Sequence, residues 1–155
     1  DEYDGDNGTA LTDTITTDLF LLDFNRSMVN NYSGVRHDSG DPFEWGEKII
    51  KHYETLGVNP LSKTLLFSDS LDFARATDIF RYFKNRALVA FGIGTFISND
   101  TEEEPLNIVM KVTKCNGQDV AKISDVSGKG MCKNADYVDY LERCIKWRLE
   151  HEKHI

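Results

Sequence analysis

Four short groups of polar residues have the side-chain types needed to hold a ligand that carries phosphate and hydroxyl groups. The groups are Thr12-Asp13, Arg36-x-Asp38, Ser68-Asp69 and Gly92-x-Gly94-Thr95. Each follows a short apolar run that predicts a β-strand, and the spacings of 24, 33 and 25 residues (12 to 36, 36 to 69 and 69 to 94) are typical of one strand–helix unit. Because α/β proteins bind ligands where the carboxyl ends of their strands meet, we expect the four groups to lie together.

The two charged residues Arg36 and Asp38 are two positions apart on one predicted strand, so both side chains point to the same side of it. A cation beside an anion suits a ligand with a phosphate and vicinal hydroxyls. A structural ion pair at a strand end is an equally good interpretation. Asp69 also has two interpretations: an acceptor for a ribose hydroxyl, or the cap of a helix that starts near Asp72.

The loop Gly92-Ile93-Gly94-Thr95 lacks the third glycine of a dinucleotide-binding fingerprint and is not a Walker loop. Its context, with a strand before it and a hydroxyl after it, favours backbone N–H groups that point at an anion. The chain offers no Ser-His-Asp or Cys-His set. His151 and His154 have a spacing that suits a metal ion, but a solvated helix end is the favoured interpretation, and we predict no protein-built metal site.

The apolar pattern predicts four strand-then-helix units, an antiparallel hairpin and a last helix. The expected strands are Ala10–Thr14, Ser33–Asp38, Thr64–Phe67 and Ala87–Phe91, and the expected helices are Ile15–Phe24, Asp41–Gly57, Asp72–Phe83 and Ala135 to about Glu150. Asp41 before Pro42 is typical of a helix start. Strands that alternate with helices indicate an α/β fold with a parallel sheet, and four units make half of a β/α barrel with open edges at its first and last strands.

The hairpin is predicted from Asn116-Gly117, which lies between the apolar runs Leu106–Cys115 and Gln118–Ser124. In that register Cys115 faces Gln118, Lys114 faces Asp119, and Lys111 faces Lys122. Two facing lysines are unfavourable unless an anion lies between them, and splayed, solvated lysines are the favoured interpretation. A loop from Ser124 to Gly130 is expected to lead to the last helix.

The composition is that of an ordinary globular chain of 155 residues, with 40% hydrophobic and 28% charged residues. Acidic residues outnumber basic ones by 26 to 18, and the net charge of −8 argues against a nucleic-acid partner. No apolar run approaches the roughly 20 residues of a membrane span, so we expect no membrane partner. The three widely spaced cysteines favour a reducing cytoplasm. The length fits one domain, and the start without Met predicts a piece of a longer protein.

Six stretches in consistent order cover nearly the whole chain: ALTDTITTDLFLLDF, GVRHDSGDPFEWGEKIIKHYETLG, TLLFSDSLD, FGIGTFISND, LNIVMKVTKCNG and AKISDVSGKGMC. They resemble the nicotinate phosphoribosyltransferase family of bacterial type. The resemblance implies an enzyme that forms nicotinate mononucleotide from nicotinate and phosphoribosyl pyrophosphate, coupled to ATP hydrolysis, in the salvage route to NAD. It also implies an irregular β/α barrel and a homodimer whose subunits share sites.

Position by position, the resemblance implies that Arg36 lies near phosphate, Asp38 near the ribose, and Asp69 on ribose hydroxyls. The other implied contacts with substrate or phosphate are Thr12, Ser68, Gly92, Gly94 and Thr95, with Gly94-Thr95 on the 5′-phosphate. ATP is the implied co-substrate, and Mg²⁺ is expected on the pyrophosphate. His37 and Phe96 depart from the family pattern and are expected at loop positions.

The phosphorylated histidine of the family lies upstream of the first strand and is not among the residues of this chain. We therefore expect residues 1–155 to be one piece, the C-terminal part of the barrel, which holds the ribose–phosphate side and is inactive alone. We also expect an exposed apolar patch along one sheet edge. The alternatives are a nicotinamide or quinolinate phosphoribosyltransferase, or a non-catalytic nucleotide-binding module.

Overall fold

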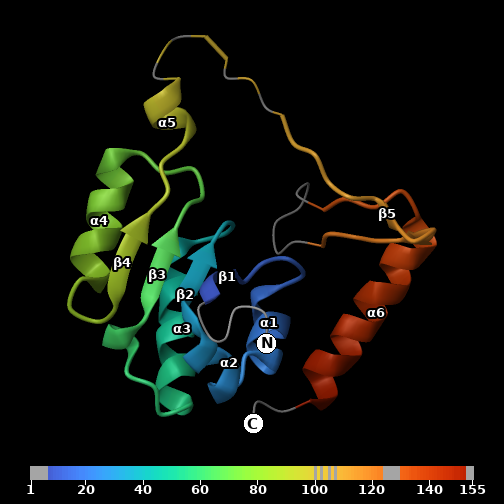
Figure 1. Cartoon of the computed structure of the whole chain (residues 1–155), viewed down its shortest axis with the longest axis horizontal. Coiled ribbons are helices and arrows are strands. Elements are labelled where there is room, and N and C mark those ends of the chain that lie inside the picture. Colours follow the sequence, from blue (N-terminus) through green and yellow to red (C-terminus); the bar gives the residue numbers. More distant parts are fainter. Residues whose placement is uncertain are drawn as a thin grey trace.

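The computed structural model describes residues 7–99, 101, 103, 104, 106, 108–123 and 130–152, and a parallel four-stranded sheet forms its centre (Figure 1). The strands are β1 (Asn7–Leu11), β2 (Tyr32–His37), β3 (Thr64–Phe67) and β4 (Leu88–Phe91), in that spatial order. All three neighbouring pairs are parallel. The predicted α/β class with a parallel sheet is confirmed. The four strands form an open sheet with β1 and β4 at its edges, so the barrel stays a prediction.

Helices connect the strands, and all of them except α5 begin after a residue whose side chain caps the helix. They are α1 (Thr17–Asp23), α2 (Arg26–Asn31), α3 (Pro42–Thr55), the 3₁₀ helix η1 (Pro60–Ser62), α4 (Phe73–Phe83) and the short α5 (Thr95–Ser98). Asp41 caps α3 by accepting hydrogen bonds from the backbone N–H groups of Phe43 and Glu44, each at 2.9 Å. Just past the end of α3, Gly57 takes a positive φ of 67°, as the sequence predicts.

The core of residues 7–99, which we call the sheet region, lies between the sheet and its helices. Val35 and Leu65 from the strands and Ile49 and Ile79 from α3 and α4 are all fully buried in it. The two helices approach closely at Gly46, where a Cβ would lie 2.3 Å from Cζ of Phe83. This packing covers the sheet with helices and leaves the carboxyl ends of its strands available to form a site.

Residues 106–152, which we call the C-terminal region, contain β5 (Lys114–Cys115), β6 (Gln118–Asp119) and α6 (Ala135–His151). Asn116 and Gly117 have positive φ values of 50° and 77°, and Lys114 pairs with Asp119, so the predicted turn and its register are confirmed. The predicted hairpin length is wrong. Beyond the backbone bond from Val120 to Thr113, the returning arm pairs Lys122 with Met131 and not with Lys111.

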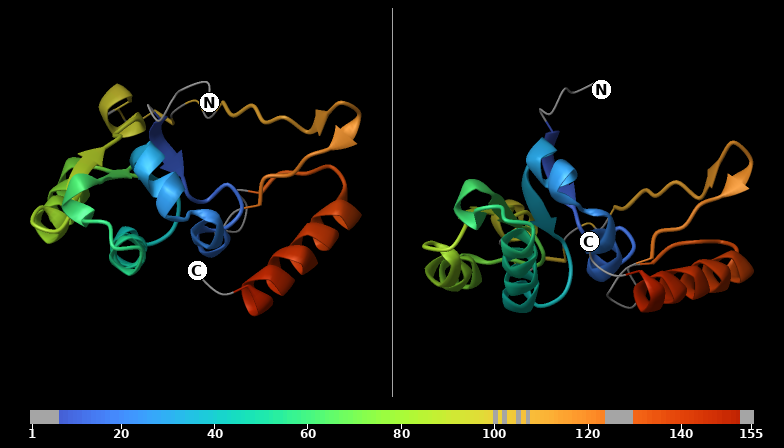
Figure 2. Two further views of the ribbon diagram at one scale, coloured as in Figure 1. Left: turned by 60° about the horizontal axis from the view of Figure 1, so that its bottom comes forward. Right: turned by 90° about the horizontal axis from the view of Figure 1, so that it is seen from below.

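The C-terminal region lies beside the sheet region, with α6 next to α1 (Figure 2). Arg148 of α6 donates to both carboxylate oxygens of Asp23 at the end of α1, at 2.7 and 3.1 Å. No residue of α6 is buried. Large apolar side chains are most exposed at residues 106, 108–110 and 112, and Leu88 of the edge strand β4 is 52% exposed. An apolar patch along the sheet edge stays a prediction. Among the helices of the described residues, none combines the length and apolarity of a membrane-spanning segment.

Several local predictions need correction. β1 starts at Asn7, three residues before the expected strand, and α2 was not expected, although Asn25 caps it through the N–H of Met28. His37 is the last residue of β2 and Phe96 lies in α5, so neither is a loop position. The predicted loop 124–130 falls outside the described residues except for its last residue.

Candidate functional site

The carboxyl ends of β2 and β3 bring Arg36, Asp38 and Ser68 into direct contact. Arg36 donates from Nε to Oγ of Ser68 and from a terminal guanidinium nitrogen to Oδ1 of Asp38, both at 2.8 Å. Ser68 in turn donates to the carbonyl of His37 at 2.9 Å. The cross-strand contact fixes the guanidinium, since its planar fork is held at two points. The side chains of Arg36 and Asp38 remain 44% and 32% exposed, so a ligand can reach both.

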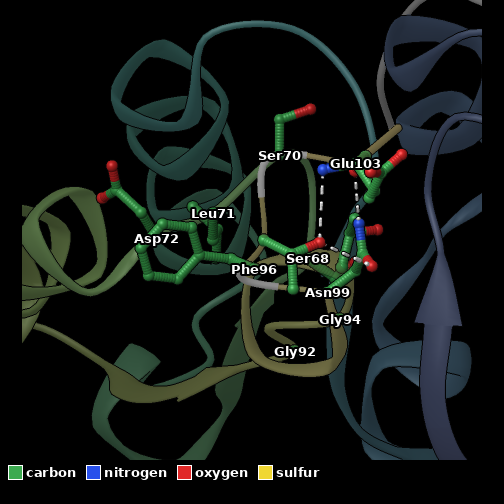
Figure 3. A pocket seen from close by; sticks show the side chains of 11 residues that line it. Ser68, Ser70, Leu71, Asp72, Gly92, Gly94, Phe96, Asn99 and Glu103 are labelled. Atoms are coloured by element: carbon green, nitrogen blue, oxygen red, sulfur yellow. Dashed lines mark hydrogen bonds between the residues drawn. The ribbon is translucent and has the colours of Figure 1, made fainter. Parts of the chain in front are cut away.

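Beside this cluster, the ends of β3 and β4 enclose a cavity of about 560 Å³ (Figure 3). Four predicted site residues line it: Ser68, Gly92, Gly94 and Thr95. The other lining residues are Ser70, Leu71, Asp72, Phe96, Asn99, Thr101 and Glu103. Ser68 forms part of the wall and also accepts the hydrogen bond from Arg36, so the guanidinium lies one side chain away from the cavity.

The two glycines that line the cavity differ in the space available for a side chain: little at Gly92 and ample at Gly94. A Cβ at Gly92 would lie 3.1 Å from Cβ of Ser68, so a larger residue there would press on the wall. A Cβ at Gly94 would meet no atom within 4 Å. Ser70 has a φ of 51°, a left-handed conformation that is strained for a residue other than glycine. This local strain beside a cavity is typical of a functional site.

Asp69 lies between two lining residues, Ser68 and Ser70, and accepts a hydrogen bond from Oγ of Ser70 at 3.3 Å. The cap of α4 is Asp72, which accepts from the N–H of Arg75 at 2.7 Å. The capping interpretation of Asp69 is therefore wrong. Its interpretation as an acceptor for a ribose hydroxyl stays a prediction.

Thr12 does not face the cavity. It is 1% exposed, and its hydroxyl accepts a hydrogen bond from Nε1 of Trp45 at 2.9 Å and donates to the carbonyl of Arg36 at 3.3 Å. The hydroxyl thus uses both its hydrogen-bond donor and an acceptor position for partners inside the protein. This position gives no support to the predicted contact with phosphate. Thr12 instead joins β1 to the strand that carries Arg36 and to α3.

Asp13, which the sequence groups with Thr12 as a possible ligand contact, is buried and does not line the cavity. Oδ2 of Asp13 accepts a hydrogen bond from Ser39 at 2.7 Å and lies 3.5 Å from Nζ of Lys122. Oδ1 of Asp13 has no hydrogen-bond partner among the described residues. Sequence spacing could not reveal this cluster, because Lys122 comes from the C-terminal region, more than 100 positions away in the chain.

His37 is buried against the rings of Trp45 and Phe67, with centroid distances of 5.2 and 5.9 Å. Burial lowers the pKa of its imidazole, and the nearby carboxylates of Asp69 and Asp13 offset only part of that effect, together with Asp38. Neither ring nitrogen has a hydrogen-bond partner among the described residues. The ring is therefore neutral near pH 7. It packs against aromatic side chains as an apolar group of the core, next to Asp38 in the chain.

The far wall of the cavity comes from residues that the sequence reading missed. Nδ2 of Asn99 donates to the carbonyl of Glu103 at 2.9 Å, and the hydroxyl of Thr101 donates to Oδ1 of Asn99 at 3.3 Å (Figure 3). The charged lining residues, Asp72 and Glu103, are both acidic. Within the described residues, no group of three or more His, Cys, Asp or Glu side chains is arranged to hold a metal ion.

The sequence model of the nicotinate phosphoribosyltransferase (NAPRTase) family matches residues 1–147. The chain belongs to this family. It is 48% identical to the nicotinate phosphoribosyltransferase of Vibrio vulnificus over 99% of this chain, and 54% identical to that of Erwinia tasmaniensis over 94%. These relatives carry the same family name as the resemblance predicts.

Solved structures agree with this membership. The chain superposes on nicotinate phosphoribosyltransferase from Vibrio cholerae with a TM-score of 0.87 at 47% identity, and on that from Porphyromonas gingivalis with 0.84 at 41%. The alignments cover 92% and 93% of this chain but 36% and 39% of those chains. The chain also spans little more than a third of the curated relatives, 37% and 36% of their lengths.

Proposed function

We propose that this chain supplies the ribose–phosphate side of a nicotinate phosphoribosyltransferase active site. In the proposed reaction, the ring nitrogen of nicotinate forms a bond to C1 of phosphoribosyl pyrophosphate while the bond from C1 to the pyrophosphate oxygen breaks. The products are nicotinate mononucleotide and pyrophosphate, and ATP hydrolysis drives the equilibrium toward the nucleotide. The observation that carries the proposal is the exposed Arg36–Asp38–Ser68 cluster beside the cavity, in a chain of this family.

The proposed role of Arg36 is to hold an anionic oxygen of the donor. Its guanidinium is anchored by Ser68 and Asp38 through one nitrogen each and keeps further N–H donors for a ligand. Anchoring reduces the entropy that the side chain loses on binding, so the contact with phosphate is pre-organised. The same contact would stabilise negative charge that grows on the leaving pyrophosphate in the transition state.

The proposed role of the two aspartates is to orient the ribose. Asp38 and Asp69 follow neighbouring strands, and carboxylate oxygens accept hydrogen bonds from vicinal hydroxyls. Their negative charge also suits the oxocarbenium-like carbon that develops as pyrophosphate leaves. Gly94 and Thr95 would receive the 5′-phosphate, since the open space at Gly94 lets backbone N–H groups approach an anion.

The donor set fits a Mg²⁺ ion that arrives on the pyrophosphate better than one held by the protein alone. Mg²⁺ takes one or two carboxylates together with substrate phosphates, and Asp38 and Asp69 offer such oxygens at adjacent strand ends. The ion would neutralise charge on the leaving group. The residues of this chain would keep the ribose and the 5′-phosphate in line with it.

The remaining features of the proposed enzyme concern the longer polypeptide. The open edges of β1 and β4 support closure of the sheet into an irregular β/α barrel when further strands are present. We propose that this polypeptide acts as a homodimer in the cytoplasm, with nicotinate, phosphoribosyl pyrophosphate and ATP as its substrates. The net charge of −8 supports a role without nucleic acid.

The test uses the full-length polypeptide, meaning one of the relatives' length that carries this sequence. Product formation from nicotinate, nicotinamide and quinolinate is measured by chromatography with phosphoribosyl pyrophosphate and with or without ATP. We expect nicotinate mononucleotide alone, at a rate that ATP increases. A product from another pyridine would replace the proposed substrate, and nucleotide binding without any product would support a non-catalytic module.

The variant Arg36→Ala tests the site itself. Loss of a charge-assisted contact with phosphate predicts at least about tenfold weaker binding of phosphoribosyl pyrophosphate, with little change in melting temperature. The control Lys48→Ala removes another exposed cation whose ion pair with Asp18 lies outside the cavity. Normal binding in Arg36→Ala together with a much lower melting temperature would show that the residue serves only as a structural ion pair.

A further inference from the structure

The indole of Trp45 joins the ends of three neighbouring strands from within the core. Trp45 lies in the first turn of α3 and is 6% exposed. Its ring centroid lies 5.2 Å from that of His37, the last residue of β2, and 5.3 Å from that of Phe67, the last residue of β3. Its Nε1 donates to the hydroxyl of Thr12, the residue that follows β1, at 2.9 Å. Two of these strands, β2 and β3, carry the exposed polar cluster of the candidate site.

The hydroxyl of Thr12 transmits the position of this indole to the backbone of Arg36. An indole N–H can only donate, so the hydroxyl of Thr12 accepts it and has its own proton left for one acceptor. That acceptor is the backbone carbonyl of Arg36, at 3.3 Å. The same carbonyl also accepts from the backbone N–H of Thr12, at 3.4 Å. Both donors belong to a residue that is 1% exposed, so water does not compete for these bonds.

The opposite side of β2 is held in a matching way by Ser68. Its backbone N–H and its hydroxyl both donate to the carbonyl of His37, at 3.1 and 2.9 Å. Its hydroxyl oxygen also accepts from Nε of Arg36, at 2.8 Å. The backbone of Arg36 is thus fixed from β1, and that of His37 from β3. A displacement on the β1 side would therefore move the guanidinium relative to Ser68 and to the cavity that Ser68 lines.

We propose, on the basis of the proposed function, that Trp45 is a positioning residue for Arg36: its indole N–H, acting through Thr12, fixes where the guanidinium meets a phosphate oxygen of the donor. Trp45 is buried and does not line the cavity, so it acts without touching the substrate. The N–H and not the ring has this role, because a hydrogen bond fixes both distance and direction, whereas apolar packing tolerates small shifts. A displacement of about 1 Å is enough to weaken a contact of this kind.

Variants that separate the N–H from the ring test this role in the full-length polypeptide. Trp45→Phe removes the donor and keeps an aromatic ring, Thr12→Val removes the hydroxyl at nearly constant shape, and Thr12→Ser keeps the hydroxyl. We expect the first two to raise the KM for phosphoribosyl pyrophosphate by about fivefold or more and to leave the KM for nicotinate within about twofold of the parent. Thr12→Ser should recover most of the affinity. The control Trp147→Phe alters the 56% exposed tryptophan of α6 and should resemble the parent.

A purely structural role of Trp45 predicts a different result. Loss of packing alone would lower the melting temperature and the fraction of folded enzyme, so kcat would fall while both KM values stayed at those of the parent. That result would overturn the proposal. Equal increases in the KM values for the two substrates would overturn it as well, and so would equal effects of Trp45→Phe and Trp147→Phe.

Double variants test whether the effect passes through Arg36, with binding of phosphoribosyl pyrophosphate measured by titration calorimetry. In an Arg36→Ala polypeptide, the added Trp45→Phe should weaken binding by less than about twofold, because the group that Trp45 positions is gone. Adding Thr12→Val to Trp45→Phe should likewise weaken binding little further, since both break the same chain of hydrogen bonds. A full additional loss in either double variant would contradict the proposed role.

Calorimetry also distinguishes failure of the positioning role from failure of the proposed reaction. A parent that binds phosphoribosyl pyrophosphate without forming a nucleotide would refute the reaction. The ratio of its affinity to that of Trp45→Phe would still decide the positioning role, which a ratio near one overturns. A parent that does not bind phosphoribosyl pyrophosphate would overturn both.

Discussion

The sheet region and the C-terminal region are built from similar proportions of apolar residues but use them in opposite ways. Among the described residues, every buried hydrophobic side chain belongs to the sheet region, between Leu19 and Ala87. In the C-terminal region, α6 buries none, and the large apolar side chains at residues 106, 108–110 and 112 are 69–93% exposed. The difference teaches that the sheet region has its own core, whereas the described residues of the C-terminal region leave large apolar side chains exposed.

Two ion pairs join the C-terminal region to the sheet region. Arg148 binds Asp23, and Lys122 lies near Asp13, at two separate places on the sheet region. The Arg148–Asp23 pair is partly exposed and contributes little to stability because water competes for both partners. Asp13 is only 1% exposed, so its contact with Lys122 is not an exposed ion pair. The sheet region should therefore unfold as one cooperative unit that α6 affects weakly.

The largest contrast is expected between Phe67→Ala and Met110→Ala in the 155-residue chain. Phe67 is fully buried and stacks on Phe83 with a centroid distance of 5.6 Å, so its truncation should lower the free energy of unfolding by about 3–5 kcal/mol. Met110 is 93% exposed, and its truncation should change that free energy by less than about 0.5 kcal/mol. Urea denaturation followed by circular dichroism measures both. Similar losses would break the comparison between the regions.

A second contrast concerns two glycines of the sheet region. A Cβ at Gly34 would lie 2.0 Å from the carbonyl oxygen of Thr64, so Gly34→Ala must push β2 and β3 apart and should cost about 3 kcal/mol. Gly94→Ala meets no atom and should leave the free energy of unfolding nearly unchanged. In the full-length polypeptide, the same Gly94→Ala should weaken binding of phosphoribosyl pyrophosphate. Normal binding there would remove Gly94 from the proposed phosphate contact.

The buried His37 predicts a pH dependence that belongs to the sheet region. Because burial holds its pKa in the folded state below the ordinary 6.5, the unfolded chain takes up a proton first as the pH falls below 6.5. Stability should then decrease by up to about 1.4 kcal/mol per pH unit until the folded-state pKa is reached, and His37 should contribute no pH dependence above pH 6.5. His37→Gln should flatten this slope in urea titrations at pH 5 to 7. Equal flattening by the control His151→Gln would contradict the assignment.

The smallest effect is expected from Arg148→Ala. The guanidinium lowers the pKa of Asp23 through a hydrogen bond at 2.7 Å, but the side chains of Asp23 and Arg148 remain 58% and 33% exposed. The urea midpoint of the sheet region should stay within experimental error of the parent. Amide exchange in α6 should become faster, as it should in the parent chain at high salt. A clear shift of the urea midpoint would show that α6 is part of the cooperative unit.

Local signals were sufficient for most of the sheet region because its elements are bounded by residues with strong conformational preferences. Asp41-Pro42 and Gly57 delimit α3, and the apolar run Thr64–Phe67 coincides with β3. The same signals failed for the arms of the hairpin. The turn at Asn116-Gly117 is local and was predicted, but the length of a hairpin depends on what lies opposite each arm, and here that is Met131 for one arm.

For the candidate site, the sequence by itself determined the class of chemistry, because each polar group follows a strand and parallel strands end at one edge. It also determined membership in the family, since the motifs are specific. Only the tertiary structure decided which groups form the exposed cluster beside the cavity: Arg36 and Ser68 meet across two strands, whereas Thr12 turns inward to Trp45. The physical reason is that hydrogen-bond partners and burial depend on contacts between residues far apart in the chain, which spacing along one strand does not contain.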